Sequence, residues 1–178
     1  MSFLVQLQLG IDRFTELSGR ILAWLLLLVM LITCVVVVLR YGFDLGFIAL
    51  QESITYLHAS VFLLGIAYAL KHGSHVRVDI FYRNYSARTK AWIDSLGAIV
   101  FLMPLCAYIF FISWDFVSQS WQINEVSPEP GGIPAVYWLK SLILIMACNL
   151  CLQAIAETIR HLGTLIEPEA GGESGTDG

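Results

Sequence analysis

The side chains best suited to chemistry in this 178-residue sequence are its four histidines, His58, His72, His75 and His161. A haem needs two axial histidines on facing helices at similar depth. His58 lies inside a long apolar run, whereas His72 and His161 lie near the ends of two such runs and could meet at one membrane surface. A haem-binding or redox-complex membrane anchor is therefore one alternative. Histidines that satisfy hydrogen bonds at helix ends fit the same spacing.

Acidic side chains offer a second kind of chemistry, the coupling of ions to transport. A small ion-coupled carrier needs an acidic residue deep in a span, but Glu52, Asp94, Asp115 and Glu157 all lie near the ends of apolar runs. The first and second halves of the chain also show no internal repeat of the kind found in many transporters. An independent carrier is therefore poorly supported.

The cysteines do not indicate a metal or redox site. Cys148 and Cys151 have CxxC spacing, but they lie in an apolar run without a second pair, and Cys34 and Cys106 lie in other apolar runs. In lipid such cysteines behave as small apolar residues. With no phosphate-binding loop and no nucleophile motif either, we expect no enzyme activity, no disulfide and no cofactor.

The composition requires a membrane. The chain is 57% hydrophobic and only 13% charged, which is more apolar surface than a soluble domain of this size can bury. Much of the net charge of −4 comes from residues 163–178, a Gly/Glu-rich stretch that we expect to be a disordered acidic tail. No basic excess remains to suggest nucleic acid as a partner.

The uncharged runs predict an all-α integral membrane protein with four transmembrane helices, at about residues 21–39, 50–71, 92–114 and 136–159. The first run is about 28 Å long at 1.5 Å per residue, close to the thickness of a bilayer core. Ser86 is a suitable N-cap for the third helix, and Gly73 is a suitable C-terminal glycine for the second. Pro104 predicts a kink in the third span. Together, residues 18–162 form the expected four-helix transmembrane domain.

Residues 1–17 precede the first span and predict a different element. Apolar residues recur at three- and four-residue spacing, while Asp12, Arg13 and Glu16 fall mostly on the other side. This pattern is typical of an interfacial amphipathic helix that lies along the membrane surface.

The basic residues predict the topology. Eight of the ten lysines and arginines fall on one side if both termini share it, and only Arg40 and Lys140 fall on the other. The positive-inside rule then places both termini in the cytoplasm.

Polar residues inside the spans indicate protein neighbours. Gln51, Thr55 and His58 share one side of the second span, and Asn149, Gln153 and Glu157 recur every four residues in the fourth. Such stripes face protein rather than lipid, and Glu157 can pair with Arg160 or His161. The residues alone therefore indicate an accessory or scaffold subunit of a larger membrane complex.

Several landmarks resemble a known family, the small membrane subunit (DctQ-like small permease) of tripartite ATP-independent periplasmic (TRAP) transporters. They are Arg40-Tyr41, Glu52, Gly65 and the motif Gly73-x-His75-Val76-x-Val78-Asp79. A later stretch resembles the mannitol/chloroaromatic-type subgroup through Trp121, Glu125, Ser127, Gly131-Gly132 and Lys140.

The resemblance implies a division of labour in a bacterial inner membrane. A periplasmic substrate-binding protein captures an organic acid such as a 2-oxo acid or lactate, and a large subunit of about twelve spans moves it by a sodium-coupled elevator. The small subunit is a non-catalytic scaffold. Candidate signature or subunit-contact residues are Arg40, Glu52, Gly65, Gly73, His75, Asp79, Asn149 and Gln153, and Glu125 and Glu129 are candidates for docking of the binding protein.

Overall fold

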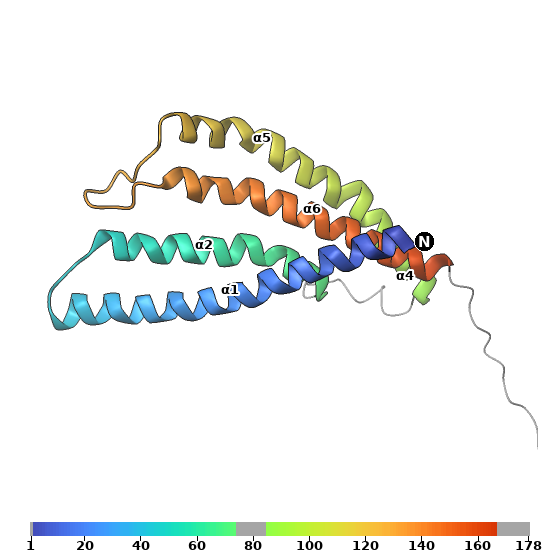
Figure 1. Ribbon diagram of the computed structural model, residues 1–178, viewed down its shortest axis with the longest axis horizontal. Coiled ribbons are helices and arrows are strands. Elements are labelled where there is room, and N and C mark those ends of the chain that lie inside the picture. Colours follow the sequence, from blue (N-terminus) through green and yellow to red (C-terminus); the bar gives the residue numbers. More distant parts are fainter. Residues whose placement is uncertain (1, 74–84, 167–178) are drawn as a thin grey trace, which may run out of the picture.

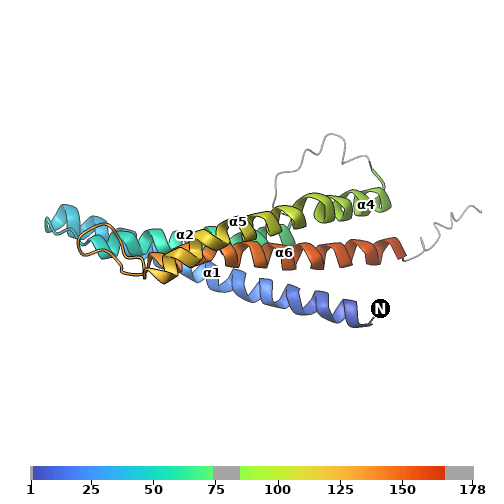
Figure 2. The same cartoon turned by 90° about the horizontal axis from the view of Figure 1, so that it is seen from above.

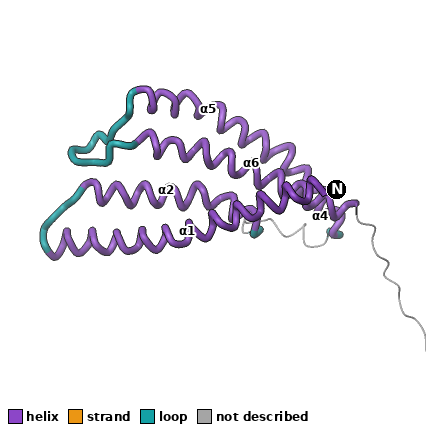
Figure 3. Tube along the Cα trace, viewed as in Figure 1, coloured by secondary structure: helices purple, strands orange, loops and turns teal. Residues whose placement is uncertain are grey.

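The computed structural model describes residues 2–73 and 85–166, and in this part of the chain the regular elements are all helices, with no strand (Figures 1 and 3). The elements in chain order are α1 (Ser2–Gly42), α2 (Ile48–Lys71), α4 (Ala87–Gly97), the π-helical turn η1 (Ala98–Leu102), α5 (Met103–Gln122) and α6 (Val136–Ile166).

The four predicted spans are confirmed as helices long and apolar enough to cross a membrane: Phe3–Gly42, Ile48–Lys71, Arg88–Gln122 and Val136–Gly163. Each helix is longer than the uncharged run inside it, because polar residues extend the helix at one or both ends. Residues 163–166 of the expected tail continue α6, and the rest of the tail lies outside the described residues.

The predicted N-terminal segment is helical, but it is continuous with the first span in a single helix of 41 residues. Its apolar side is exposed, with Phe3 74% and Phe14 54% accessible, whereas Thr15 on its polar side is buried at 3%. The polar side therefore faces the rest of the chain rather than water. That the segment lies at the membrane surface stays a prediction.

The ends of α2 follow local chemistry. Gly73 has φ +62° and donates its backbone N–H to the Leu70 carbonyl at 3.1 Å, so the glycine expected after the helix takes the left-handed conformation. Ser86 likewise caps α4 by accepting from the Thr89 N–H. Because α2 begins at Ile48, Glu52 lies in its second turn rather than its first.

The third span contains a π turn where proline predicted a kink. The Met103 N–H donates to the Ala98 carbonyl, five residues earlier, so η1 is wider than an α-turn. Pro104 follows at once near the start of α5. Proline lacks an N–H and clashes with the carbonyl four residues before it, and a wide turn relieves that clash within a continuous helix.

The C-terminal helix α6 is the centre of the arrangement. It packs against α1, α2, α4, η1 and α5, whereas α1 and α2 also pair with each other. Figure 2 shows α6 between α1 on one side and α4–α5 on the other. The connections 43–47 and 123–135 lie at one end of the molecule, called here the loop end (Figure 1). α1 begins and α6 finishes at the opposite end, called here the terminal end.

A glycine sets the approach of α1 to α2. A Cβ at Gly19 would lie well inside van der Waals contact of the Tyr68 ring. Small residues at such positions allow helices in a membrane to approach closely. The crossing of α1 and α2 therefore depends on Gly19.

We expect Gly19→Ala to destabilise the protein by roughly 1–3 kcal/mol, because the added methyl group overpacks this crossing. The measurement is the free energy of unfolding of the purified protein in detergent. Gly10→Ala in the same helix is the matched control, since a Cβ there meets nothing within 4 Å, and it should be neutral or slightly stabilising. Equal stabilities of the two variants would contradict the assignment.

Candidate functional site

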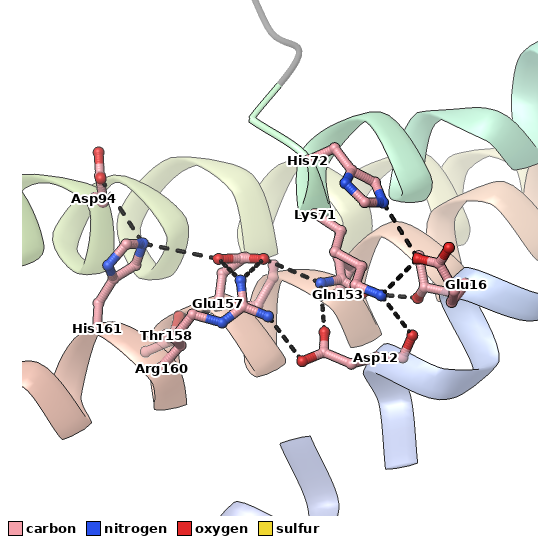
Figure 4. A network of polar contacts seen from close by, with 12 residues as sticks. Asp12, Glu16, Lys71, His72, Asp94, Gln153, Glu157, Thr158, Arg160 and His161 are labelled. Carbon is pink, nitrogen blue, oxygen red and sulfur yellow. Dashed lines mark hydrogen bonds and ion pairs between the residues drawn. The ribbon is translucent and has the colours of Figure 1, made fainter. Parts of the chain in front are cut away.

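A buried amide joins α6 to α1 near the terminal end. Gln153 is fully buried. Its Oε1 accepts from Thr15 Oγ1 at 2.7 Å, while its Nε2 donates to Asp12 Oδ1 at 3.2 Å and to Glu157 Oε1 at 3.1 Å. Three hydrogen bonds thus satisfy the amide of Gln153, which lipid hydrocarbon could not do. They also tie α6 to α1; Figure 4 shows the contacts of Gln153 with Asp12 and Glu157.

Charged pairs surround this amide. Arg160 lies between two carboxylates, with Nη1 2.6 Å from Glu157 Oε1 and Nη2 2.7 Å from Asp12 Oδ2. Lys71 at the end of α2 donates to the Asp12 carbonyl at 2.9 Å and to Glu16 Oε2 at 3.0 Å. Each carboxylate is therefore matched by a cation, and the network connects α1, α2 and α6.

A cavity of about 310 Å³, with a mostly apolar lining, lies beside this network. His161 faces it with its Nε2 3.7 Å from Asp94 Oδ2 and 3.9 Å from Glu157 Oε2, so it links α6 to α4 (Figure 4). The remaining lining is small or apolar, including Leu70 and Ala154. The residues that line the cavity belong to α2, α4, η1 and α6 at the terminal end.

A second polar cluster at the loop end is organised by Glu52. Its carboxylate accepts from Ser127 Oγ, and from the Ile133 backbone N–H at 2.5 Å. A Cβ at Gly132 would clash with both the Ser127 side chain and this carboxylate. Glu52 therefore holds the 123–135 loop on α2, an arrangement called here the Glu52 clamp. Because the backbone comes so close to these side chains at position 132, a glycine is needed there.

Beside this clamp, Lys140 of α6 forms an ion pair with Glu125 of the loop. The Lys140 ammonium also lies 4.0 Å from the centroid of the Phe116 ring, a cation–π contact with α5. The hydrogen bond from Lys140 lowers the pKa of Glu125 below its ordinary value. Trp121 Nε1 donates to Ser141 Oγ at 2.8 Å. The Lys140–Glu125 pair thus holds the loop on α6, and the Trp121–Ser141 hydrogen bond holds the end of α5 there.

The candidate residues selected from the sequence differ in their bonding and exposure in the structure. Glu52, Glu125 and Gln153 bond within the chain, whereas Arg40 and Glu129 are exposed. Gly65 has open space around it. Asn149 is half-buried, and Gly73 has its expected turn conformation. His75 and Asp79 lie outside the described residues.

The three histidines in the described part of the chain, His58, His72 and His161, do not form the pair that a haem would need. His72 lies 3.3 Å from Glu16, and His161 faces Asp94 and Glu157, whereas His58 stacks on Phe62 of its own helix. In residues 2–73 and 85–166, no three His, Cys, Asp or Glu side chains come together in a way that could hold a metal. The described contacts lend no support to the haem-anchor alternative.

Sequence reasoning predicted the Glu157–Arg160 pair, which is confirmed, but missed the long-range partners. Asp12 and Glu16 were assigned to the solvent side of a surface helix, and the anchoring of the loop by Glu52 was not foreseen. One signal was present in the N-terminal segment: Asp12, Thr15 and Glu16 share a helix face through three- and four-residue spacing, which marks a polar face that protein could cover.

A comparison with known families decides the assignment. Residues 29–164 match the family described as "Tripartite ATP-independent periplasmic transporters, DctQ component". The chain belongs to the DctQ family. Neither a curated protein nor a solved structure matches it.

The DctQ match covers residues 29–42 of α1, all of α2, α4, η1 and α5, and almost all of α6. It therefore includes both polar clusters except for their α1 residues, Asp12, Thr15 and Glu16. DctQ proteins are components of transporters rather than enzymes, and in this one the polar groups of both clusters hold helices and a loop together. The family match does not confirm the mannitol/chloroaromatic-type subgroup.

For this DctQ chain we expect Gln153→Leu to lower the free energy of unfolding by about 1–3 kcal/mol, since Thr15, Asp12 and Glu157 would each lose a hydrogen bond in a buried site. The measurement is unfolding in detergent. Asn149→Leu, one helical turn earlier and half-buried, is the matched control and should have little effect. A larger loss in the control would contradict the central role of Gln153.

The depressed pKa of Glu125 makes the loop sensitive to acid. The ion pair stabilises the folded state fully above the ordinary carboxyl pKa of 4.5, and this contribution is lost as the pH falls through the lower folded-state value. We expect acidification below the ordinary carboxyl pKa to change the tryptophan fluorescence near the loop, because Trp121 and Trp138 make an edge-to-face contact there. Glu125→Gln should lack this transition, and an unchanged transition in that variant would contradict the assignment.

Proposed function

We propose that this DctQ protein is the non-catalytic small subunit of a sodium-coupled TRAP transporter that imports organic acids. The carboxylates we favour are 2-oxo acids or lactate. Its partners would be a large elevator-type membrane subunit and a periplasmic substrate-binding protein. The observation that carries the proposal is the match of residues 29–164 to the DctQ component.

The way the chain uses its polar residues supports a scaffold role. The terminal-end network and the Glu52 clamp join helices and a loop to one another, and the cavity beside the network is lined by residues of the terminal end. In the most apolar stretch of α1, and likewise in that of α2, only 6% of the residues are buried within the chain. A chain with rigid ends and largely exposed spans is suited to standing beside another membrane protein.

The proposed topology has both termini in the bacterial cytoplasm. The terminal end would then be cytoplasmic and the loop end periplasmic, which agrees with the excess of basic residues on the terminal side. In this orientation the 123–135 loop would face the binding protein. Glu129 is exposed there, whereas Glu125 is already paired with Lys140, so Glu129 is the better candidate for docking.

Reconstituted transport tests the function. We expect sodium-driven uptake of a labelled 2-oxo acid or lactate into proteoliposomes only when this chain, the large subunit encoded beside it and the binding protein are all present. The reason is that neither polar cluster of this chain forms a route for substrate. Uptake would be measured with and without a sodium gradient, and a reporter fused at position 83 would check the topology.

Three results would contradict parts of the proposal. Full uptake without this chain would exclude a required subunit role, and uptake by this chain alone would exclude a scaffold role. A Soret absorption band in the purified protein would instead favour the haem-anchor alternative. Glu129→Lys should weaken uptake at limiting concentrations of binding protein if the loop is a docking surface, with Glu173→Lys as the control for added charge.

A further inference from the structure

One side of α2 carries a stripe of residues spaced by four and three positions along the helix. Its members are Gln51, Thr55, His58, Phe62, Gly65 and Ala69. A 4-3 spacing is the heptad pattern by which one helix packs along another at a small crossing angle. The stripe extends along nearly the whole of α2 (Ile48–Lys71).

The described part of the chain leaves the middle of this stripe exposed, while Gln51, Gly65 and Ala69 are half-buried. Thr55 and His58 are exposed, and Phe62 is 66% accessible. The residues that pack α2 inside the protein point elsewhere: Ala67 is buried at 5%, and Tyr68 lies against Gly19 of α1.

Lipid is a poor cover for these side chains. His58 follows the start of α2 by ten residues, or about 15 Å at 1.5 Å per residue, which is near the middle of a bilayer core. Exposed Thr33 of α1 donates its hydroxyl to the Val29 carbonyl at 2.7 Å, whereas in the described part of the chain Thr55 makes no such bond. Polar groups at this depth require protein partners.

Gly65 points to a helix as that partner. A glycine within a helix costs roughly 1 kcal/mol relative to alanine, and within this chain nothing lies within 4 Å of a Cβ placed there. Packing inside the protein therefore does not explain the glycine. Small residues such as Gly65 and Ala69 let a neighbouring membrane helix approach closely.

We propose that the Gln51–Ala69 stripe of α2 is the surface that receives a transmembrane helix of the large subunit. The inference rests on the proposed function, and it names the surface through which this chain would contact the large subunit. The partner helix would pack closely against Gly65 and Ala69. It would present a polar side chain or a free carbonyl opposite Thr55 and His58, because these two groups are the ones left to satisfy.

Photo-crosslinking in the intact complex tests this surface without disturbing it. The photoactivatable residue p-benzoylphenylalanine replaces Phe62 in one variant and Met30 of α1 in the control, where the side chain is also exposed, at 55%. We expect illumination to link position 62 to the large subunit and to leave position 30 without that product. Linkage of position 62 to a second copy of this chain, or to lipid alone, would overturn the proposal.

A substitution provides the second readout. Gly65→Leu adds bulk to open space in the isolated chain, so the chain should fold as before. It should reduce the amount of co-purified large subunit by about tenfold or more, as expected when a packed interface must accommodate a larger side chain. Ala23→Leu, at an exposed position of α1, adds similar bulk and should leave co-purification unchanged.

The outcomes separate this proposal from the one on which it rests. If the wild-type chain co-purifies with the large subunit but Gly65→Leu does so equally well, the stripe is not the contact surface and the scaffold role stands. If the wild-type chain does not co-purify with a large subunit at all, the proposed function itself fails. Unfolding of the isolated Gly65→Leu chain, measured in parallel, shows whether a loss of binding reflects the interface.

Discussion

The fold depends on the requirement that a buried amide in a membrane protein find all of its partners inside the chain. Gln153 meets it by bonding to Thr15, Asp12 and Glu157. Because two of these partners belong to α1 and one to α6, the amide fixes the position of one helix against the other. Arg160 and Lys71 then neutralise the surrounding carboxylates and bring α2 into the same network. Hydrogen bonds of this kind contribute modestly one by one in membranes, but leaving any of these groups unpaired would be costly.

The two ends of the molecule pair their polar groups in different ways. At the terminal end, charged groups pair between helices, and most of them lie on helical turns that extend past the apolar spans. At the loop end, a single carboxylate, Glu52, accepts two neutral donors and holds a loop rich in proline and glycine. Next to the terminal-end network, small residues such as Gly19 and Ala154 bring helices together. The polar stripe of α2 is the exception, since within residues 2–73 and 85–166 the side chains of Thr55 and His58 have no hydrogen-bond partner.

Hydropathy predicted the four spans because each membrane helix must carry an apolar run about as long as the bilayer core is thick. Local chemistry predicted the Ser86 cap, the Gly73 turn and the Glu157–Arg160 pair, because all three involve residues within one or two helical turns of each other. The pairing of Asp12 with Arg160 spans 148 positions and could not be predicted from periodicity, which identifies a polar face but not the helix that covers it. For the same reason the polar side of α1 was assigned to solvent, and the role of Glu52 was missed.

The central position of α6 has a consequence for the order in which the protein can assemble during synthesis. α1 and α2 can pair as soon as both have entered the membrane. The third span, made of α4, η1 and α5, packs mainly against α6. The ribosome completes α6 last. Until then Asp12 and Thr15 lack their partners Gln153 and Arg160, and the third span lacks its main packing partner. Proteins made of such long-range contacts stay open to quality-control proteases until the last element arrives. A nascent chain stalled before Gln153 would therefore be recognisable to the cell as unfinished, even with three of its four spans already inserted.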